Sequence, residues 1–204
     1  MIKTNAKRFK SLKIGITGVS GTLGKALTKK LKSHGAYVIG ISSQAIKSPD
    51  LNQDSPNEWQ TWRCGEEALI KETLEKLDIL VLNHGVNYQG SQSNLEINKS
   101  LEVNAISSWR LIEVFENIAI ERNQSANIPE IWVNTSEAEI QPALSPTYEI
   151  SKRLIGQLVT IKMKNVNTVK DPNLKIRKLI LGPFKSNLNP IGIMNVDLVA
   201  NKII

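Results

Sequence analysis

The sequence predicts one α/β domain in which a doubly wound parallel sheet lies between two layers of helices. Short apolar runs alternate along the chain with longer amphipathic segments, which is the order of parallel strands joined by crossover helices. A glycine-rich loop separates the first apolar run from the first amphipathic segment. The length of 204 residues, with 41% hydrophobic and 22% charged residues, is ordinary for one domain with its own core.

The first half of the chain shows these elements in turn. LKIGITG is a buried strand bounded by glycine, and the helix after it has leucines at helical spacing and ends in lysine and glycine. AYVIGIS is a second strand, the polar segment 44–58 a loop, WQTWRC a short third strand and EEALIKETLEKL a helix. In residue numbers, we expect strands within 12–18, 36–42 and 59–64, and helices within 22–35 and 66–77.

The second half continues the alternation. DILVLNHG is the strongest strand pattern of the chain, because four apolar residues in a row follow its first residue. EIWVNTS and LKIRKLILGPF are two further apolar runs. We therefore expect strands within 78–85, 130–136 and 174–184, and helices within 100–120, within 148–165 and from residue 196 onward.

The charge distribution and the cysteine content indicate the partners and the cellular compartment to expect. Five of the positive charges fall within the first thirteen residues, and the formal net charge is +7. We interpret residues 1–12 as a solvated basic tail before a domain of residues 13–204; weak attraction to anionic lipid or nucleic acid is the alternative. We expect no nucleic-acid partner, because no such motif accompanies the charge. Cys64 is the only cysteine, which favours a reducing compartment and a cytoplasmic location. No apolar run is long enough to cross a membrane.

The loop TGVSGTLG carries Gly18, Gly21 and Gly24 at intervals of three. Between a strand and a helix, the first glycine permits a tight turn, the second lets backbone approach a pyrophosphate, and the third lets the helix pack closely on the sheet. The helix N-terminus then offers free N–H groups to the phosphates. A purely structural turn is the alternative.

The choice between NAD and NADP stays open at the end of the second strand. That strand ends in Ser42 and Ser43, where a dinucleotide site often has a carboxylate that binds the adenosine ribose. Without a carboxylate to repel a 2′-phosphate, and with Lys47 close downstream, NADP(H) is weakly favoured over NAD(H). A serine could equally bind the free ribose hydroxyl of NAD.

Tyr148 and Lys152 lie one helical turn apart and therefore project from the same face. A nearby ammonium stabilises phenolate, so the pair suits an acid that must release a proton. A half-buried tyrosine and a surface lysine are the structural alternative.

The order of these motifs resembles that of the short-chain dehydrogenases/reductases over about residues 13 to 200. The resemblance rests on the glycine loop, Asn83-His84-Gly85, Asn104 and Tyr148-x-x-Ser151-Lys152. It implies a three-layer Rossmann-type fold and a single NAD(P)-binding domain.

The resemblance also implies roles for individual residues. Tyr148 would be the acid/base, Lys152 would bind the nicotinamide ribose and favour the phenolate, and Asn104 would hold a water in a proton relay. His84 is expected to be packed or next to the cofactor rather than catalytic. We expect no metal. The predicted cofactor contacts are Gly18, Ser20, Gly21, Thr22, Leu23, Gly24, Ser42, Ser43, Asn83, Gly85, Lys152, Pro183 and Ser186.

The chain departs from the family pattern after the fifth strand, where the family has a serine that polarises the carbonyl. Aligning on the strand places Glu137 there, whereas counting thirteen back from Tyr148 gives Thr135. Ser136 lies between them and is the best candidate. A carboxylate at Glu137 pointing into the site would disfavour a developing oxyanion.

The sixth strand shows a second departure, because it runs into Gly182-Pro183 rather than Pro-Gly. The segment NLNPIGIMN is shorter than the family's substrate-binding helices, and the family's seventh strand is missing from the sequence pattern. We consider a truncated chain, or a native substrate side that stays open and is completed by a partner.

These residues lead us to expect an NAD(P)(H)-dependent oxidoreductase that interconverts a carbonyl and an alcohol in a small molecule. The alternatives are a dinucleotide-binding sensor or assembly subunit without turnover, and a membrane-surface accessory protein. The resemblance also implies homodimerisation through the two helices that hold Asn104 and Tyr148, whose apolar positions are Val103, Ile106, Ile112, Phe115, Ile150, Leu154, Leu158 and Ile161.

Overall fold

A parallel sheet of six strands forms the centre of the protein, in the order β3-β2-β1-β4-β5-β6. The computed structural model describes residues 8–44, 54–89, 93–122, 127–167 and 173–204. All six predicted strands are confirmed, and the chain reverses its direction of winding between β1 and β4, where ligands bind in such sheets. The strands are β1 (Lys13–Thr17), β2 (Tyr37–Ser42), β3 (Glu58–Thr61), β4 (Ile79–Leu82), β5 (Glu130–Ser136) and β6 (Lys175–Leu181).

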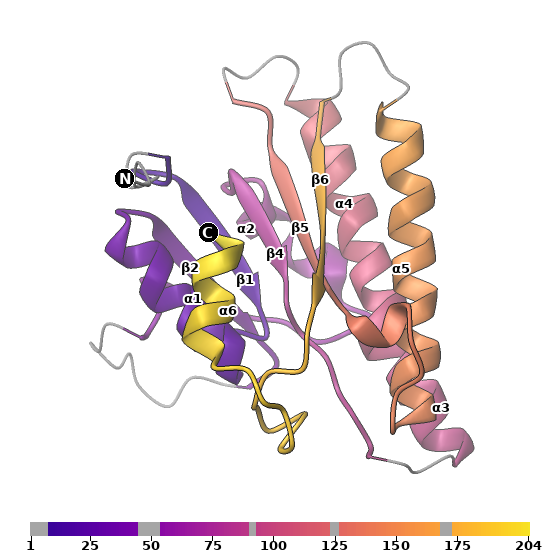
Figure 1. Ribbon diagram of the computed structural model, residues 1–204. Coiled ribbons are helices and arrows are strands. Elements are labelled where there is room, and N and C mark those ends of the chain that lie inside the picture. The colour runs from indigo at the N-terminus through magenta and orange to yellow at the C-terminus, as the bar shows by residue number, and fades with distance from the viewer. Residues whose placement is uncertain (1–7, 45–53, 90–92, 123–126, 168–172) are drawn as a thin grey trace.

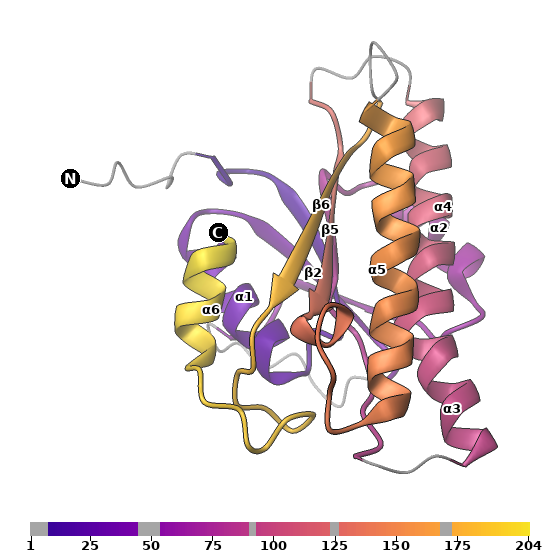
Figure 2. The same cartoon turned by 45° about the vertical axis from the view of Figure 1, so that its right-hand side comes forward.

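Helices cover both faces of this sheet and complete the predicted three layers (Figures 1 and 2). One face carries α1 (Thr22–Ser33) and α6 (Val196–Ile203). The other carries α2 (Lys71–Leu74), α4 (Ser107–Glu121) and α5 (Pro146–Asn167), with α3 (Asn94–Leu101) beside α5.

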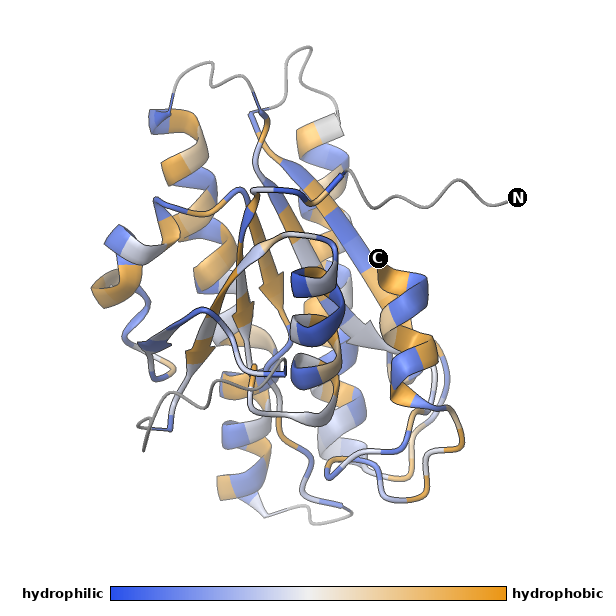
Figure 3. Ribbon diagram, turned by 90° about the vertical axis from the view of Figure 1, so that its left-hand side faces the viewer, coloured by the Kyte–Doolittle hydropathy of each residue, from blue (hydrophilic) through white to orange (hydrophobic). Residues whose placement is uncertain are grey.

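The two cores follow from the period of two along each strand. In β4, Leu80 and Leu82 point to the core under α4 and α5, whereas Ile79 and Val81 point to the core under α1. Figure 3 shows the strands as largely hydrophobic segments between helices that are hydrophilic on their outer sides. Gly15 leaves room for Leu77, whose side chain packs where a Cβ would stand.

Two predicted helices differ in detail from the structure. The helix expected within 66–77 is a 3-10 turn, η2 (Glu67–Ile70), followed by the short α2, which ends at Leu74. The helix expected within 100–120 begins earlier, with α3, and passes through a π-helical turn, η3 (Glu102–Ile106), into α4.

The packed domain reaches back to Arg8, beyond the start that we predicted at Lys13. Phe9 is fully buried and meets the Trp132 ring edge-on, at 6.0 Å between centroids. Arg8 pairs with Glu130 at 3.2 Å. Burial of one phenyl side chain contributes about 2 kcal/mol, enough to fix this short segment against the sheet.

The eight apolar positions expected at a dimer interface differ in exposure, and three of them, Val103, Leu154 and Leu158, are half-buried. Ile112 and Phe115 are buried in the protein's own core, so they are not available to a second copy. Ile106, Ile150 and Ile161 are exposed and remain consistent with the predicted homodimer. Within the described ranges, no helix combines the length and apolar character that crossing a membrane requires.

Candidate active site

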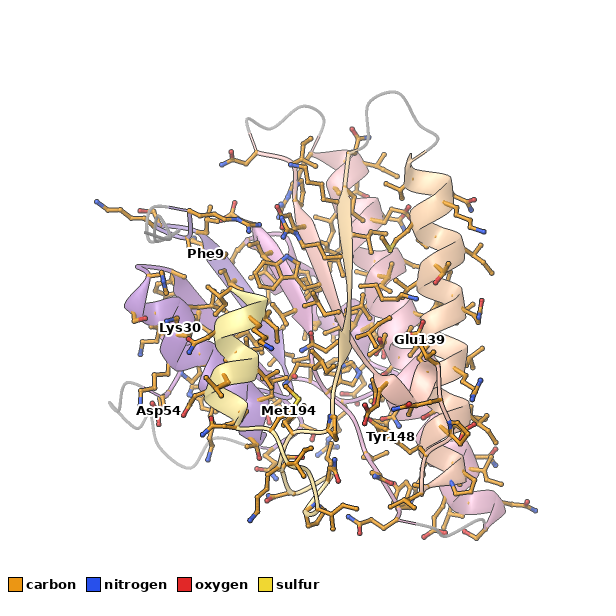
Figure 4. The ribbon with its side chains drawn as sticks, viewed as in Figure 1. Phe9, Lys30, Asp54, Glu139, Tyr148 and Met194 are labelled. Carbon is orange, nitrogen blue, oxygen red and sulfur yellow. The ribbon has the colours of Figure 1, made fainter. Side chains whose placement is uncertain are left out.

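A cleft made of two adjoining cavities, of about 570 and 480 Å³, lies at the carboxyl end of the sheet. Asn83, His84 and Gly85, directly after β4, line both cavities and join them. The larger cavity holds Tyr148 and Lys152, and the smaller one holds the glycine loop. Figure 4 shows Tyr148 between α5 and the loop that follows β6.

The glycine loop forms a cradle that side chains would fill. Gly18 has φ +62°, and a Cβ on it would lie 2.7 Å from the Cα of His84. A Cβ on Gly24 would lie 2.5 Å from the Gly18 carbonyl oxygen, so α1 can pack this closely on the loop only with glycine. Gly21 is the N-cap of α1, and no described side chain caps this helix. Its first N–H groups are therefore available to an anion.

The far end of the smaller cavity lies where β2 and β3 end. The hydroxyl oxygens of Ser20 and Ser42 are 3.2 Å apart, and Ser43 lines the wall beside them. Arg63, just after β3, lines the same cavity and is exposed. The sequence alone does not identify Arg63 as a site residue, because it reaches this cavity only when the end of β3 pairs beside the end of β2. Lys47 lies outside the described residues.

Hydrogen bonds connect the glycine loop to Lys152 across three strands. The Asn83 side-chain amide donates to the Gly18 carbonyl (3.4 Å), and that of Asn134 donates to Asn83 Oδ1 (3.0 Å). Lys152 Nζ donates to the Asn134 carbonyl (3.4 Å). Asn134 Oδ1 is buried without a described partner, although the side chain lines the larger cavity. A ligand hydroxyl or amide could satisfy this oxygen.

Tyr148 and Lys152 meet as expected from their spacing. Lys152 Nζ lies over the Tyr148 ring, 5.6 Å from its centroid, and both side chains line the larger cavity. Lys152 is only 6% exposed, so its charge acts in a medium that water screens weakly.

Three residues at the end of β5 compete for the role of carbonyl polariser. Thr135 is buried, and its hydroxyl donates to the Leu179 carbonyl of β6 at 3.4 Å. Ser136 Oγ accepts from the Ala138 N–H at 3.3 Å, which leaves the hydroxyl hydrogen free to donate to a ligand. Thr135, Ser136 and Glu137 all line the larger cavity. Ser136 therefore fits the role better than Thr135.

Asn104 lies behind the cavity wall, in the middle of the π-helical turn. Its Oδ1 accepts from the Val86 N–H (2.7 Å), and its Nδ2 donates to the Val86 carbonyl (2.9 Å). It thus pairs with Val86 as a neighbouring strand would, and so holds the segment after β4. The extra residue of a π turn is a frequent feature of functional sites. The water relay expected of Asn104 stays a prediction.

His84 is a packed neutral histidine between β1 and α4. Its Nδ1 lies 2.7 Å from Thr17 Oγ1, and its Nε2 lies 2.9 Å from Ser107 Oγ. The Thr17 and Ser107 hydroxyls also donate to backbone carbonyls, those of Val81 (3.3 Å) and Val103 (2.9 Å), and the neutral ring carries its proton on one of its two nitrogens. Burial, followed by the positive charge of Lys152, lowers the pKa of His84 to about 3.

The loop after β6 closes the cleft on the side of α6. Pro183 and Ser186, which are predicted to contact the cofactor, line the larger cavity together with Phe184. Asn87, from the segment after β4, donates to the Leu188 carbonyl at 3.0 Å and ties the two sides of the cleft together.

The cleft therefore has the parts that a dinucleotide needs. The glycine cradle and the open N-terminus of α1 suit a pyrophosphate, and the unpaired oxygen of Asn134 beside Lys152 suits a polar group further along. Of the predicted site residues, Gly24 and Asn104 support the walls, and all the others line one cavity or both.

Comparison with known proteins agrees with this geometry. A model of the NAD dependent epimerase/dehydratase family matches residues 14–162. The chain is 42% identical over 201 residues to the monoglucosyldiacylglycerol epimerase of Synechocystis sp. (strain ATCC 27184 / PCC 6803 / Kazusa). That match includes 98% of this chain and 47% of the relative, so the chain spans about half the relative's length.

Two solved structures show the same fold at low identity. A short chain dehydrogenase from Leptospira borgpetersenii with bound NAD+ superposes with a TM-score of 0.82 at 17% identity, over 100% of this chain and 88% of the other. A short chain dehydrogenase from Burkholderia cenocepacia J2315 in complex with NADP gives 0.77 at 13%, over 95% and 82%. With its glycine cradle, its Tyr148–Lys152 pair and the family match over most of its length, this chain belongs to the NAD dependent epimerase/dehydratase family, within the short-chain dehydrogenases/reductases.

Proposed function

We propose that this protein is an NAD(P)-dependent epimerase that inverts a secondary alcohol of a hexose headgroup carried on a lipid. The observation that carries the proposal is the convergence of Tyr148, Lys152 and Ser136 on one cavity that continues into the glycine-loop cleft. The name of the Synechocystis relative supplies the substrate class. This reaction includes the carbonyl–alcohol step expected from the sequence, performed once in each direction.

The chain's own residues manage the proton and the developing charge. The glycine loop and Lys152 would hold a nicotinamide dinucleotide, and the chemistry that this group supplies when bound is reversible hydride transfer at the alcohol carbon, with inversion when the hydride returns to the opposite face. Tyr148, as the phenolate, would accept the hydroxyl proton, hold it as the phenol during the carbonyl stage and then give it back; the buried charge of Lys152 would stabilise the phenolate form that accepts the proton. Ser136 would donate to the carbonyl oxygen. Hydride and proton both return, so the reaction has no net oxidation.

Glu137 would help to orient the sugar ring in such a reaction. A carboxylate near a developing oxyanion is unfavourable, but a carboxylate that accepts hydrogen bonds from neighbouring sugar hydroxyls orients the ring. Asn87 and Asn189 line the same cavity and offer further polar contacts. If Glu137 instead faces the reacting oxygen, it favours the second candidate function, a dinucleotide-binding subunit without turnover.

The test compares Tyr148→Phe with the unchanged protein. We expect the variant to lose turnover by about 100- to 10,000-fold, because the phenol hydroxyl moves the proton, while NAD(P) affinity stays within about threefold. The measurement incubates each protein with glucosyldiacylglycerol in detergent and a trace of NAD+ or NADP+, and separates the sugar epimers. Tyr37→Phe, at an exposed tyrosine at the start of β2, is the matched control.

The amount of cofactor that is reduced during turnover distinguishes the candidate reactions. Epimer formation with a catalytic amount of cofactor supports the proposal. Stoichiometric reduction of the cofactor would show a simple dehydrogenase instead. Tight NAD(P) binding without any turnover would support the non-catalytic subunit.

A further inference from the structure

Exposed aliphatic side chains surround the mouth of the larger cavity. They come from two loops, one between η4 (Glu137–Glu139) and α5, the other after β6. Leu144 is 85% exposed, Ile193 87% and Ile191 70%, and all three line the cavity. We call the following residues the apolar rim: Pro142, Ala143, Leu144, Pro190, Ile191 and Ile193.

The two loops lack charged residues over long stretches. The chain has no Asp, Glu, Lys or Arg from Ile140 to Tyr148, or from Ser186 to Val196. An ordinary protein surface has roughly a quarter to a third of charged residues. Moving this rim out of water would therefore bury apolar surface without removing any charged group from water.

Backbone hydrogen bonds hold the rim in place. After β6, the Ile193 N–H donates to the Pro183 carbonyl (2.8 Å), and the Lys185 N–H donates to the Met194 carbonyl (3.1 Å). On the other loop, the Ala143 N–H donates to the carboxylate of Glu149 at 2.8 Å. The aliphatic side chains of the rim are thus presented outward by a fixed backbone. Figure 3 shows hydrophobic segments along the loop that leads into α6.

The cavity changes character along its depth. Ser136 is the last residue of β5 and Glu137 follows it, so both polar residues lie at the sheet edge, whereas the rim at the loop tips is aliphatic. A ligand that fills this cavity and emerges past the rim is polar at one end and apolar at the other. A sugar headgroup with acyl chains has this form.

We propose that the apolar rim sits in the hydrocarbon surface of a lipid bilayer, so that the headgroup of a membrane lipid reaches Tyr148 while its acyl chains stay against the rim. The role of the headgroup rests on the proposed function; the contact between rim and bilayer does not. Lys185, exposed at the base of the rim, and the net charge of +7 favour anionic lipid around the contact.

The experiment measures co-sedimentation of the full chain with phosphatidylcholine vesicles, with and without phosphatidylglycerol. We expect the double variant Leu144→Ser, Ile193→Ser to bind about tenfold or more weakly, because each substitution removes an aliphatic side chain from the contact. The matched control is Leu69→Ser, Ile120→Ser, two exposed aliphatic positions outside the rim, on η2 and α4. It should bind within about twofold of the unchanged protein. NAD(P)-induced thermal shifts show that each variant is folded.

Three outcomes would overturn the proposal: no vesicle binding by the unchanged protein, equal loss in the rim and control variants, or equal binding by all proteins. A rim variant that changes the elution volume of the protein would assign the rim to contact between two copies instead. Failure of the proposed function looks different: vesicle binding stays rim-dependent, but no epimer forms. Conversely, turnover of a short-chain alkyl glucoside without rim-dependent binding overturns only the bilayer contact.

Discussion

At the scale of single residues, the choice of dinucleotide depends on a few side chains where β2 and β3 end. Ser42 and Ser43 place hydroxyl groups there, and Arg63 is exposed on the wall of the same cavity. An arginine beside the adenosine ribose accommodates a 2′-phosphate, whereas serine hydroxyls serve either cofactor. The structure therefore offers Arg63 as a cation in addition to the Lys47 considered from the sequence.

We predict that Arg63→Ala weakens NADP(H) binding by about 10- to 100-fold and leaves NAD(H) binding nearly unchanged. The reason is the loss of charge-assisted hydrogen bonds to the 2′-phosphate. Isothermal titration with both cofactors measures the difference, and Arg63→Lys, which keeps the charge, should lie in between. Equal weakening of both cofactors would place Arg63 at a phosphate that they share.

At the scale of elements, close approach between α1 and the glycine loop forms the cradle. Gly24 lies in the first turn of α1, and the backbone of Gly18 and Val19 occupies the space that a side chain would need. Because these contacts are backbone atoms, they cannot move aside as a flexible side chain would. The N-terminus of α1 can thus lie this close to the loop only because Gly24 has no Cβ.

We predict that Gly24→Ala lowers NAD(P) affinity at least tenfold and the free energy of unfolding by about 1–3 kcal/mol, because α1 must shift away from the loop. Fluorescence titration with the reduced cofactor and urea unfolding measure the two effects. Lys29→Ala, at an exposed position of the same helix, is the control and should change neither by much. Unchanged affinity in Gly24→Ala would show that the cradle does not bind the phosphates.

At the scale of the whole molecule, burial of His84 makes folding depend on pH. The imidazole ties β1 to α4 through Thr17 and Ser107 and remains neutral, because burial and then Lys152 lower its pKa from 6.5 to about 3. Between these two values the unfolded chain binds a proton that the folded chain does not. Acid therefore favours the unfolded state in this window, and the full stability is present above pH 6.5.

We predict that the free energy of unfolding falls by at most about 1.4 kcal/mol per pH unit as the pH drops from about 6 toward 4. His84→Ala should be less stable at neutral pH, because it loses packing and hydrogen bonds, but its stability should change less over this window. Urea unfolding at several pH values provides the comparison. Ser108→Ala, which removes a neighbouring hydroxyl and leaves the ring buried, should keep the slope; equal slopes in all three proteins would contradict the assignment.

The sequence by itself determined the elements and the chemistry at their ends. Continuous apolar runs such as ILVL in β4 specify strands buried on both faces, and the spacing of Gly18, Gly21 and Gly24 specifies a loop that backbone can approach. Tyr148 and Lys152 were predictable for the same reason: four residues along a helix always return to the same face. Such regularities are local, so one chain segment is enough to show them.

Only the tertiary structure decided which segments share the cleft. The pairing of β3 with β2 brings Arg63 to the nucleotide end of the cleft. Asn104 pairs with Val86, so it supports the cavity wall from behind and does not line the cavity. Ile112 and Phe115 are buried in the protein's own core. The tertiary structure also separated Thr135 from Ser136, because the pairing of β5 with β6 occupies the hydroxyl of Thr135. Local periodicity cannot predict these contacts, because they join segments that lie far apart in the chain and become neighbours only when the elements pack together.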